Sequence, residues 1–196
     1  MILKKEGFIE VICGPMFSGK TTKLIEKVRL LIFSNFKFLV LKPEIDNRYS
    51  SKEELVTHNS KTIPCLMIKK SKDIFNFIEK DTSFLIIDEI QFFDKEIESI
   101  LNHLSYKGLN IIVAGLELDF CGRPFGSMKY LLSIADEVLK LKSSCAICHK
   151  EANRTQRILK NKIPHWNDPV ILIGGDEYHE PRCRKCHVFS KNEKNY

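Results

Sequence analysis

The chain has 196 residues, of which 43% are hydrophobic and 29% charged, values typical of a globular protein that builds its core without disulfides. The formal net charge of +6 is weak support for an anionic ligand, because most lysines and arginines are interleaved with acids. No apolar run approaches the roughly 20 residues of a membrane span and no signal peptide is recognisable, so we expect a cytoplasmic protein without a membrane partner.

The first third of the chain predicts a strand, a loop, a helix and a second strand. Residues 8–13 are a short apolar run that ends at Gly14, and a loop follows as far as Thr21. Over residues 22–32 the apolar side chains recur at spacings of three and four, which predicts a helix. Residues 36–41 predict the second strand, and such a unit is typical of a parallel sheet with right-handed crossovers.

The next stretch is less regular. Residues 46–60 are polar and predict a loop, whereas residues 63–68 predict a short strand. Ser71 is expected to cap a helix that carries Ile74 and Phe77 on its buried face.

A continuous apolar run at residues 84–87 predicts a central strand, because strands covered on both faces lack polar alternation. The elements expected after it are a helix over 94–106, a strand over 110–114, a loop over 115–126, a helix over 127–135 and a strand over 137–141. This order predicts an α/β fold of the P-loop NTPase type, in which helices flank a parallel sheet.

A phosphate-binding motif lies between the first strand and the first helix. The segment GPMFSGKT fits G-x-x-x-x-G-K-[ST] in the strand–helix context that the motif requires. Backbone N–H groups of such a loop and the positive end of the helix dipole bind the phosphates of ATP. We expect Lys20 to neutralise the β- and γ-phosphates and the Thr21 hydroxyl to ligate Mg²⁺. The predicted phosphate-binding residues are Gly14, Pro15, Met16, Phe17, Ser18, Gly19, Lys20 and Thr21.

Two acids follow the central strand. The first acid after such a strand in P-loop enzymes holds the magnesium shell, so Asp88 is assigned that role beside Thr21. Glu89 is open to three interpretations: a general base for an attacking hydroxyl, the residue that orients a water in an ATPase, or a solvated side chain at a strand end.

Seven cysteines in a cytoplasmic chain point to metal binding or packing rather than to disulfides. Four of them form two C-x-x-C pairs, and four thiolates close a tetrahedral site, which predicts structural Zn²⁺. His149 and His187 follow these pairs and are alternative ligands. The predicted division is a P-loop domain over 1–143, a zinc-binding lasso domain over 144–190 and a flexible tail over 191–196. The preferred zinc ligands are Cys145, Cys148, Cys183 and Cys186.

The segment between the cysteine pairs is long, and long loops are usually functional. Its apolar residues 170–173 are expected to offer backbone groups to a flat base, as an added strand would. Phe92, Phe93, Phe120 and Phe125 are aromatic candidates for stacking on the base.

Taken together, these motifs resemble the type II thymidine kinase family over residues 8–186. The resemblance rests on the phosphate loop, DNRYS at 46–50, the pair Thr57 and His58, DEIQFF at 88–93, the loop at 115–126 and the four cysteines. It implies transfer of the γ-phosphate of ATP to the 5′-hydroxyl of thymidine. Deoxyuridine, which lacks only the methyl group, is an expected second substrate. A homotetramer inhibited by thymidine triphosphate (dTTP) is also implied.

Site roles follow from the same resemblance. Glu89 resembles the catalytic base that takes the proton of the 5′-hydroxyl. Asp46, Arg48 and Gln91 resemble residues on the phosphate and metal side, and Met16 and Thr155 those beside the 5-methyl group. The implied nucleoside contacts are Met16, Leu116, Phe120, Phe125, Thr155, Val170, Ile171, Leu172, Ile173 and Gly174.

One position departs from the family pattern. The family tyrosine four residues before the third cysteine ligand is replaced by His179, and Tyr178 lies one place earlier, so both are candidates. The rival function of another class is a nucleic-acid-associated P-loop ATPase with a zinc ribbon. It predicts further ATPase motifs and a basic groove for which the chain has little room, so we expect no nucleic-acid partner.

Overall fold

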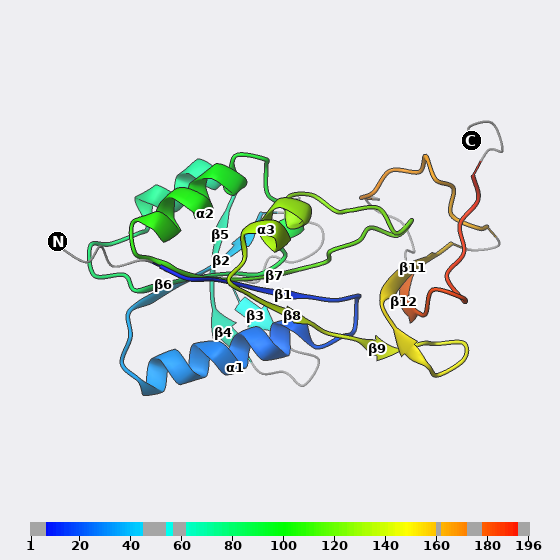
Figure 1. The fold of residues 1–196 in the computed structure, drawn as a ribbon, viewed down its shortest axis with the longest axis horizontal. Helices are drawn as coiled ribbons and strands as arrows, with labels where there is room; N and C mark the ends of the chain where they lie inside the picture. The colour runs from blue at the N-terminus through cyan, green and yellow to red at the C-terminus, as the bar shows by residue number, and fades with distance from the viewer. Residues whose placement is uncertain (1–6, 45–53, 57–61, 160–161, 172–177, 192–196) are drawn as a thin grey trace.

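The computed structural model describes residues 7–44, 54–56, 62–159, 162–171 and 178–191. Its centre is a six-stranded parallel sheet in the order β5-β2-β6-β7-β1-β8, with helices on both faces (Figure 1). The α/β prediction is therefore confirmed. The strands of this sheet are β1 (Ile9–Cys13), β2 (Phe38–Pro43), β5 (Leu66–Ile68), β6 (Phe84–Ile87), β7 (Asn110–Gly115) and β8 (Glu137–Lys140).

Helix α1 (Lys20–Phe33) covers one face of the sheet, and α2 (Ile97–Tyr106) and α3 (Met128–Ile134) cover the other (Figure 1). All three helices overlap the segments predicted as helical, and α1 begins two residues earlier than predicted, at Lys20. Among the described residues, no helix is long and apolar enough to cross a membrane.

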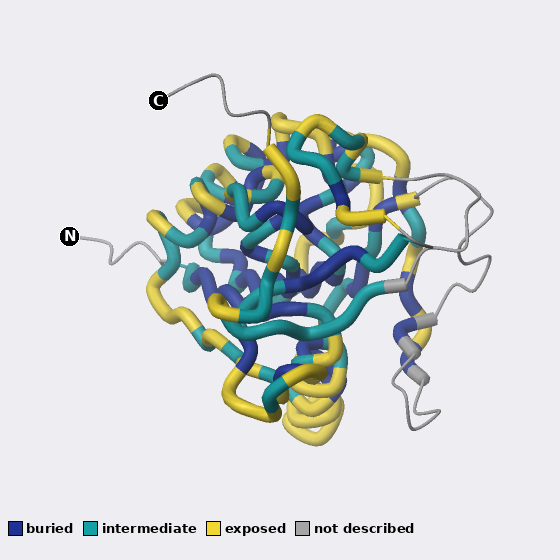
Figure 2. The backbone as a smooth tube through the Cα atoms, turned by 90° about the vertical axis from the view of Figure 1, so that its right-hand side faces the viewer, coloured by how far each residue is buried: buried dark blue, intermediate teal, exposed yellow. Residues whose placement is uncertain are grey.

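The sheet separates two hydrophobic cores, because successive side chains of a strand point to opposite faces. On β6, Leu85 and Ile87 enter the core beneath α2 and α3, whereas Ile86 enters the core beneath α1. Buried residues lie in the interior and exposed residues on the outer sides of the helices (Figure 2). The central strands are thus covered on both faces, which explains their continuous apolar runs.

The region before β6 differs from the prediction in two places. Strand β3 (Glu54–Val56) lies inside the expected loop and pairs with β4 (Thr62–Pro64) in a separate antiparallel ribbon. The single strand predicted over 63–68 is two strands, β4 and β5, in different sheets. Pro64 has no N–H group to donate to a continuing ladder, which favours the break at this point.

The helix expected from Ser71 is a short 3-10 helix, η1 (Ser71–Asn76). Its N-cap is Lys70, so the prediction that Ser71 is the cap was wrong. The Ser71 N–H instead donates to Asp94 Oδ2 at 2.9 Å. Ile74 is buried as predicted, but the helix ends before Phe77, which is exposed. The period of a 3-10 helix brings fewer side chains to one face than the predicted α-helix would.

A C-terminal lobe, residues 143–191, follows β8 and lies beyond the ends of β1 and β8 (Figure 1). It contains two antiparallel ribbons, in which β9 pairs with β10 and β11 pairs with β12. The bounds of these strands are β9 (Ser143–Ser144), β10 (Glu151–Ala152), β11 (Arg154–Ile158) and β12 (Tyr178–Arg182).

Candidate active site

Three loops of the candidate site leave the same edge of the sheet. They follow β1, β7 and β6, which are neighbours in the parallel sheet, so their carboxyl ends lie side by side. Ligands of open α/β sheets bind at this edge. The C-terminal lobe approaches the same edge and adds a further wall.

The phosphate loop has the backbone shape that its sequence predicts. Gly19 has φ 84°, a left-handed conformation that favours glycine, and α1 begins at the next residue. Lys20 is buried and its Nζ donates to the carbonyl of Pro15 at 2.8 Å. Burial lowers the pKa of Lys20, and the charges of Glu89 and Asp88 oppose that shift.

The hydroxyl of Ser18, in the same loop, is buried and has no hydrogen-bond partner among the described residues. A buried donor of this kind costs free energy unless a ligand satisfies it. Together with the helix N-terminus, this unsatisfied group fits a bound phosphate.

Asp88 is buried directly behind the phosphate loop. Its Oδ2 accepts a hydrogen bond from Thr21 Oγ1 at 3.0 Å, and its Oδ1 accepts one from the Glu89 N–H at 2.9 Å. Burial raises the pKa of Asp88 to about 7, and the nearby charge of Glu89 adds to the shift. A hydroxyl and a carboxylate at this separation are the hard oxygen donors that Mg²⁺ prefers, so the pair fits such an ion.

Glu89 leaves β6 in the left-handed region, with φ 51° and ψ 38°. This conformation is uncommon for a residue other than glycine and tends to occur at functional sites. Glu89 Oε2 accepts a hydrogen bond from Gln91 Nε2 at 2.5 Å, and Gln91 Oε1 accepts one from the Leu116 N–H at 3.0 Å. Gln91 lies in the short helix η2 (Ile90–Phe92) and ties Glu89 to the loop after β7.

A cavity of about 510 Å³ opens at this edge, a size typical of small-molecule sites. Lys20 and Glu89 are among its charged lining residues. Its lining residues are Met16, Lys20, Glu89, Phe92, Leu116, Leu118, Asp119, Phe120, Phe125, Thr155, Arg157, Val170, Ile171 and His179. Of the four aromatic candidates, Phe93 belongs to the hydrophobic core, whereas the other three line the cavity.

The C-terminal lobe contacts the phosphate loop directly, since Thr155 Oγ1 accepts a hydrogen bond from the Met16 N–H at 3.0 Å. Thr155 and Arg157 lie on one side of β11, and Arg157 is the strand partner of His179. Tyr178, one residue before His179, pairs instead with Ile158, which points to the opposite side of β11 from Arg157. Because neighbours on a strand point to opposite sides, the pairing brings His179 into the cavity.

The four predicted zinc ligands converge. The Sγ atoms of these cysteines all lie within 4.8 Å of one another, which suits one tetrahedral Zn²⁺ held by thiolates. Of the alternative ligands, His187 bonds through Nε2 to the carbonyl oxygen of Phe120 at 2.8 Å. The cluster consists of Cys145, Cys148, Cys183 and Cys186.

Several expected site residues fall elsewhere. Asp88 and Gln91 lie beside the cavity rather than in its lining, and the side chain of Tyr178 is outside the described structure. Sequence reasoning missed Leu118, Asp119 and Arg157, which line the cavity. Asp119 lay within the recognised loop motif, whereas only strand pairing brings Arg157 to the site. The expected residues outside the described ranges are Asp46, Arg48, Leu172, Ile173 and Gly174.

Comparison with known proteins gives a consistent result. A family model described as thymidine kinase matches residues 7–187. A protein named thymidine kinase from Onion yellows phytoplasma (strain OY-M) is 54% identical over 189 residues, which span 96% of this chain and 90% of that relative. A protein of the same name from Aster yellows witches'-broom phytoplasma (strain AYWB) is 53% identical over 189 residues, with the same coverage of 96% and 90%.

Proposed function

This chain belongs to the thymidine kinase family, and on that premise we propose how its side chains carry out the reaction. The enzyme transfers the γ-phosphate of ATP to thymidine. The observation that carries the assignment of roles is one cavity whose lining brings Lys20 and Glu89 together with aromatic and apolar side chains. An acceptor hydroxyl and the phosphates can therefore meet inside it.

The phosphate side of the site is Gly14–Thr21. Its N–H groups and the dipole of α1 hold the phosphates, and Lys20 exchanges its bond to the Pro15 carbonyl for phosphate oxygens. Thr21 and Asp88 would hold Mg²⁺, which when bound neutralises phosphate charge as it is transferred. Arg48 and Asp46, outside the described residues, are proposed to act on the same side.

The acceptor side is Glu89, proposed as the base that takes the proton of the 5′-hydroxyl. Its bond to Gln91 fixes one carboxylate oxygen and leaves the other for the substrate. This supports a positioning role for Gln91, which holds the base, in place of the direct phosphate contact implied by the family resemblance. The γ-phosphorus then forms a bond to the 5′-oxygen as its bond to the leaving oxygen of ADP breaks.

The base of thymidine is proposed to occupy a nucleoside slot formed by the aromatic and apolar lining of the cavity and by Thr155, Arg157 and His179. The ring of Phe120 gives it a flat wall, and Met16 and Thr155 lie side by side where the methyl group is expected. His179 takes the position of the family tyrosine, because its strand pairing directs it into the cavity. The slot consists of Met16, Leu116, Phe120, Phe125, Thr155, Arg157, Val170, Ile171 and His179. Leu172, Ile173 and Gly174, outside the described residues, are proposed to continue this wall.

Discrimination against deoxyuridine is expected to be modest, since one methyl group changes binding by only about 1–3 kcal/mol.

The four-cysteine cluster is proposed to bind structural zinc that holds β11 and β12 against the phosphate loop. We also keep the division into a P-loop domain over 1–143 and a lasso domain over 144–190 as a proposal.

A cytoplasmic homotetramer with feedback inhibition by dTTP completes the proposal. Support for an interface comes from α1, whose Leu30 and Phe33 are 63% and 90% exposed. A nucleoside triphosphate fits the arrangement, because the slot and the phosphate loop share one cavity. Sedimentation of the purified enzyme would test the tetramer, and inhibition at fixed thymidine would test dTTP.

The deciding experiment incubates zinc-replete protein with ATP, Mg²⁺ and a panel of nucleosides, and measures nucleoside monophosphate beside free phosphate. Thymidine monophosphate with little free phosphate is expected. Free phosphate without nucleotide product, especially if DNA or RNA stimulates it, would favour the nucleic-acid-associated ATPase instead.

A further inference from the structure

Arg157 is the largest side chain that is fully buried in the described structure, at 1% exposure. Taking a guanidinium out of water is costly unless hydrogen bonds and favourable electrostatics replace its hydration. Neither a motif nor periodicity singles this residue out, so its burial needs a physical reason.

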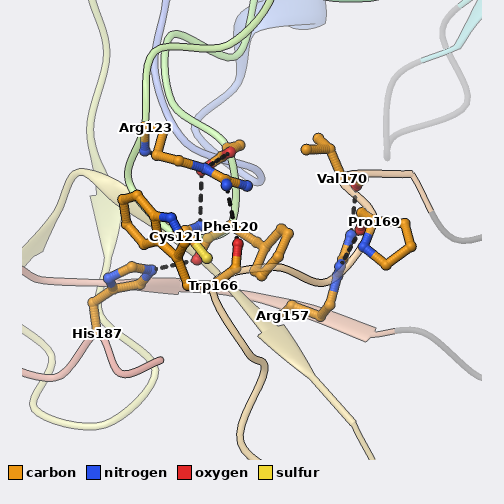
Figure 3. A network of polar contacts seen from close by, with 9 residues as sticks. Phe120, Cys121, Arg123, Arg157, Trp166, Pro169, Val170 and His187 are labelled. Carbon is orange, nitrogen blue, oxygen red and sulfur yellow. Dashed lines mark hydrogen bonds and ion pairs between the residues drawn. The ribbon is translucent and has the colours of Figure 1, made fainter. Parts of the chain in front are cut away.

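The contacts of Arg157 join two walls of the nucleoside slot (Figure 3). Its Nη1 donates to the carbonyl of Pro169 at 2.6 Å, and its Nη2 donates to the carbonyl of the next residue, Val170. Its guanidinium carbon lies 3.8 Å from the centroid of the Phe120 ring, a cation–π contact. A planar guanidinium that donates to two successive carbonyls fixes the position of that backbone far better than a single donor would.

Other residues already fasten the lobe to the loop after β7 (Figure 3). Arg123 pairs with Asp119 and donates to the carbonyl of Trp166 at 2.9 Å, while His187 bonds the carbonyl of Phe120. These links do not involve Arg157. Its loss should therefore leave the lobe docked and loosen the Pro169–Val170 backbone against Phe120.

We propose that Arg157 is a positioning residue of the nucleoside slot, which sets the distance between the Val170 backbone and the Phe120 ring and so the fit of the base. The inference rests on the proposed function, because the slot is assigned there. Its effect should fall on thymidine binding rather than on ATP or on the chemical step.

The test compares two variants. Arg157→Met keeps much of the side-chain length but removes the charge, whereas Arg157→Lys keeps the charge but removes the planar guanidinium with its paired donors. Arg154→Met, the same change on the other side of β11, is the matched control. We expect Arg157→Met to raise the thymidine KM about ten- to hundredfold, with the ATP KM and kcat within about twofold. Arg157→Lys should stay impaired, because one ammonium cannot bond two carbonyls and cover the ring.

Zinc content and the emission of Trp166, the sole tryptophan, report whether the lobe folds normally. If Arg157→Met fails to fold, calorimetric thymidine binding by folded Arg157→Lys decides the question. A wild-type thymidine KM in the folded variants would overturn the proposal. An equal rise in the KM for thymidine and in the KM for ATP would also overturn it, because a purely structural role of Arg157 predicts that result. Wild-type product formation tests the assigned activity separately.

Discussion

Replacing Glu89 by glutamine isolates the proposed base from its surroundings. The Leu116 N–H fixes the Gln91 amide, because it bonds Gln91 Oε1 at 3.0 Å. Gln91 Nε2 therefore continues to point at residue 89, as it does now at 2.5 Å from the carboxylate. A glutamine at position 89 can accept that bond with its own oxygen, so it keeps the geometry and presents an NH₂ group to the substrate.

The variant thus loses the proton acceptor and little else. Loss of a positioned general base typically lowers turnover by about 10²–10⁴, which corresponds to roughly 3–5 kcal/mol of transition-state stabilisation. ATP binding should change little, because Lys20 and the loop N–H groups remain.

The measurement is thymidine monophosphate formed per ATP consumed, at saturating substrates, with the melting temperature of both proteins as the control for folding. Turnover within about threefold of the wild type, in a folded variant, would refute the assignment of Glu89 as base. The reaction would then depend on positioning and charge neutralisation alone.

Three further results are expected. Cys183→Ser should raise the KM for thymidine more than that for ATP, because the cluster holds β12 beside the slot; equal changes in steady-state assays would argue against this. His179→Ala should weaken thymidine binding, measured by calorimetry, more than Tyr178→Ala does, and the reverse order would exclude the assignment of His179. Burial raises the pKa of Cys13 and of Cys121 to about 11, so both thiols stay protonated until the pH approaches that value. Iodoacetamide at pH 8 should leave both unmodified in the native protein and react once it is unfolded, and peptide mass spectrometry would reveal any native labelling.

Local motifs made much of the site predictable. The phosphate loop and the pair Asp88 and Glu89 are short segments whose chemistry and strand context can be read directly. The convergence of the four cysteines followed from their spacing, because two C-x-x-C pairs in one chain are typical of a metal site. Helices whose apolar side chains recur at spacings of three and four, such as α1, were predictable for the same local reason.

The remaining features depend on tertiary structure. Arg157 enters the site only because β11 pairs with β12, and no local pattern specifies that register. The link from Gln91 to Leu116 joins two loops that are distant in sequence. β3 falls in a polar stretch, and its Leu55 is buried by contacts that the sequence does not display.

The hydrogen bond from the Met16 N–H to Thr155 Oγ1 joins the phosphate loop to the wall of the cavity that the C-terminal lobe provides. A nucleotide that shifts the phosphate loop is expected to shift the proposed wall of the nucleoside slot as well, because Thr155 belongs to that wall. Thermodynamic linkage then requires reciprocity: whatever factor ATP applies to the affinity for thymidine, thymidine applies to the affinity for ATP. If the proposed slot is correct, the C-terminal lobe takes part in the energetic coupling between the two substrates and also supports the binding of thymidine.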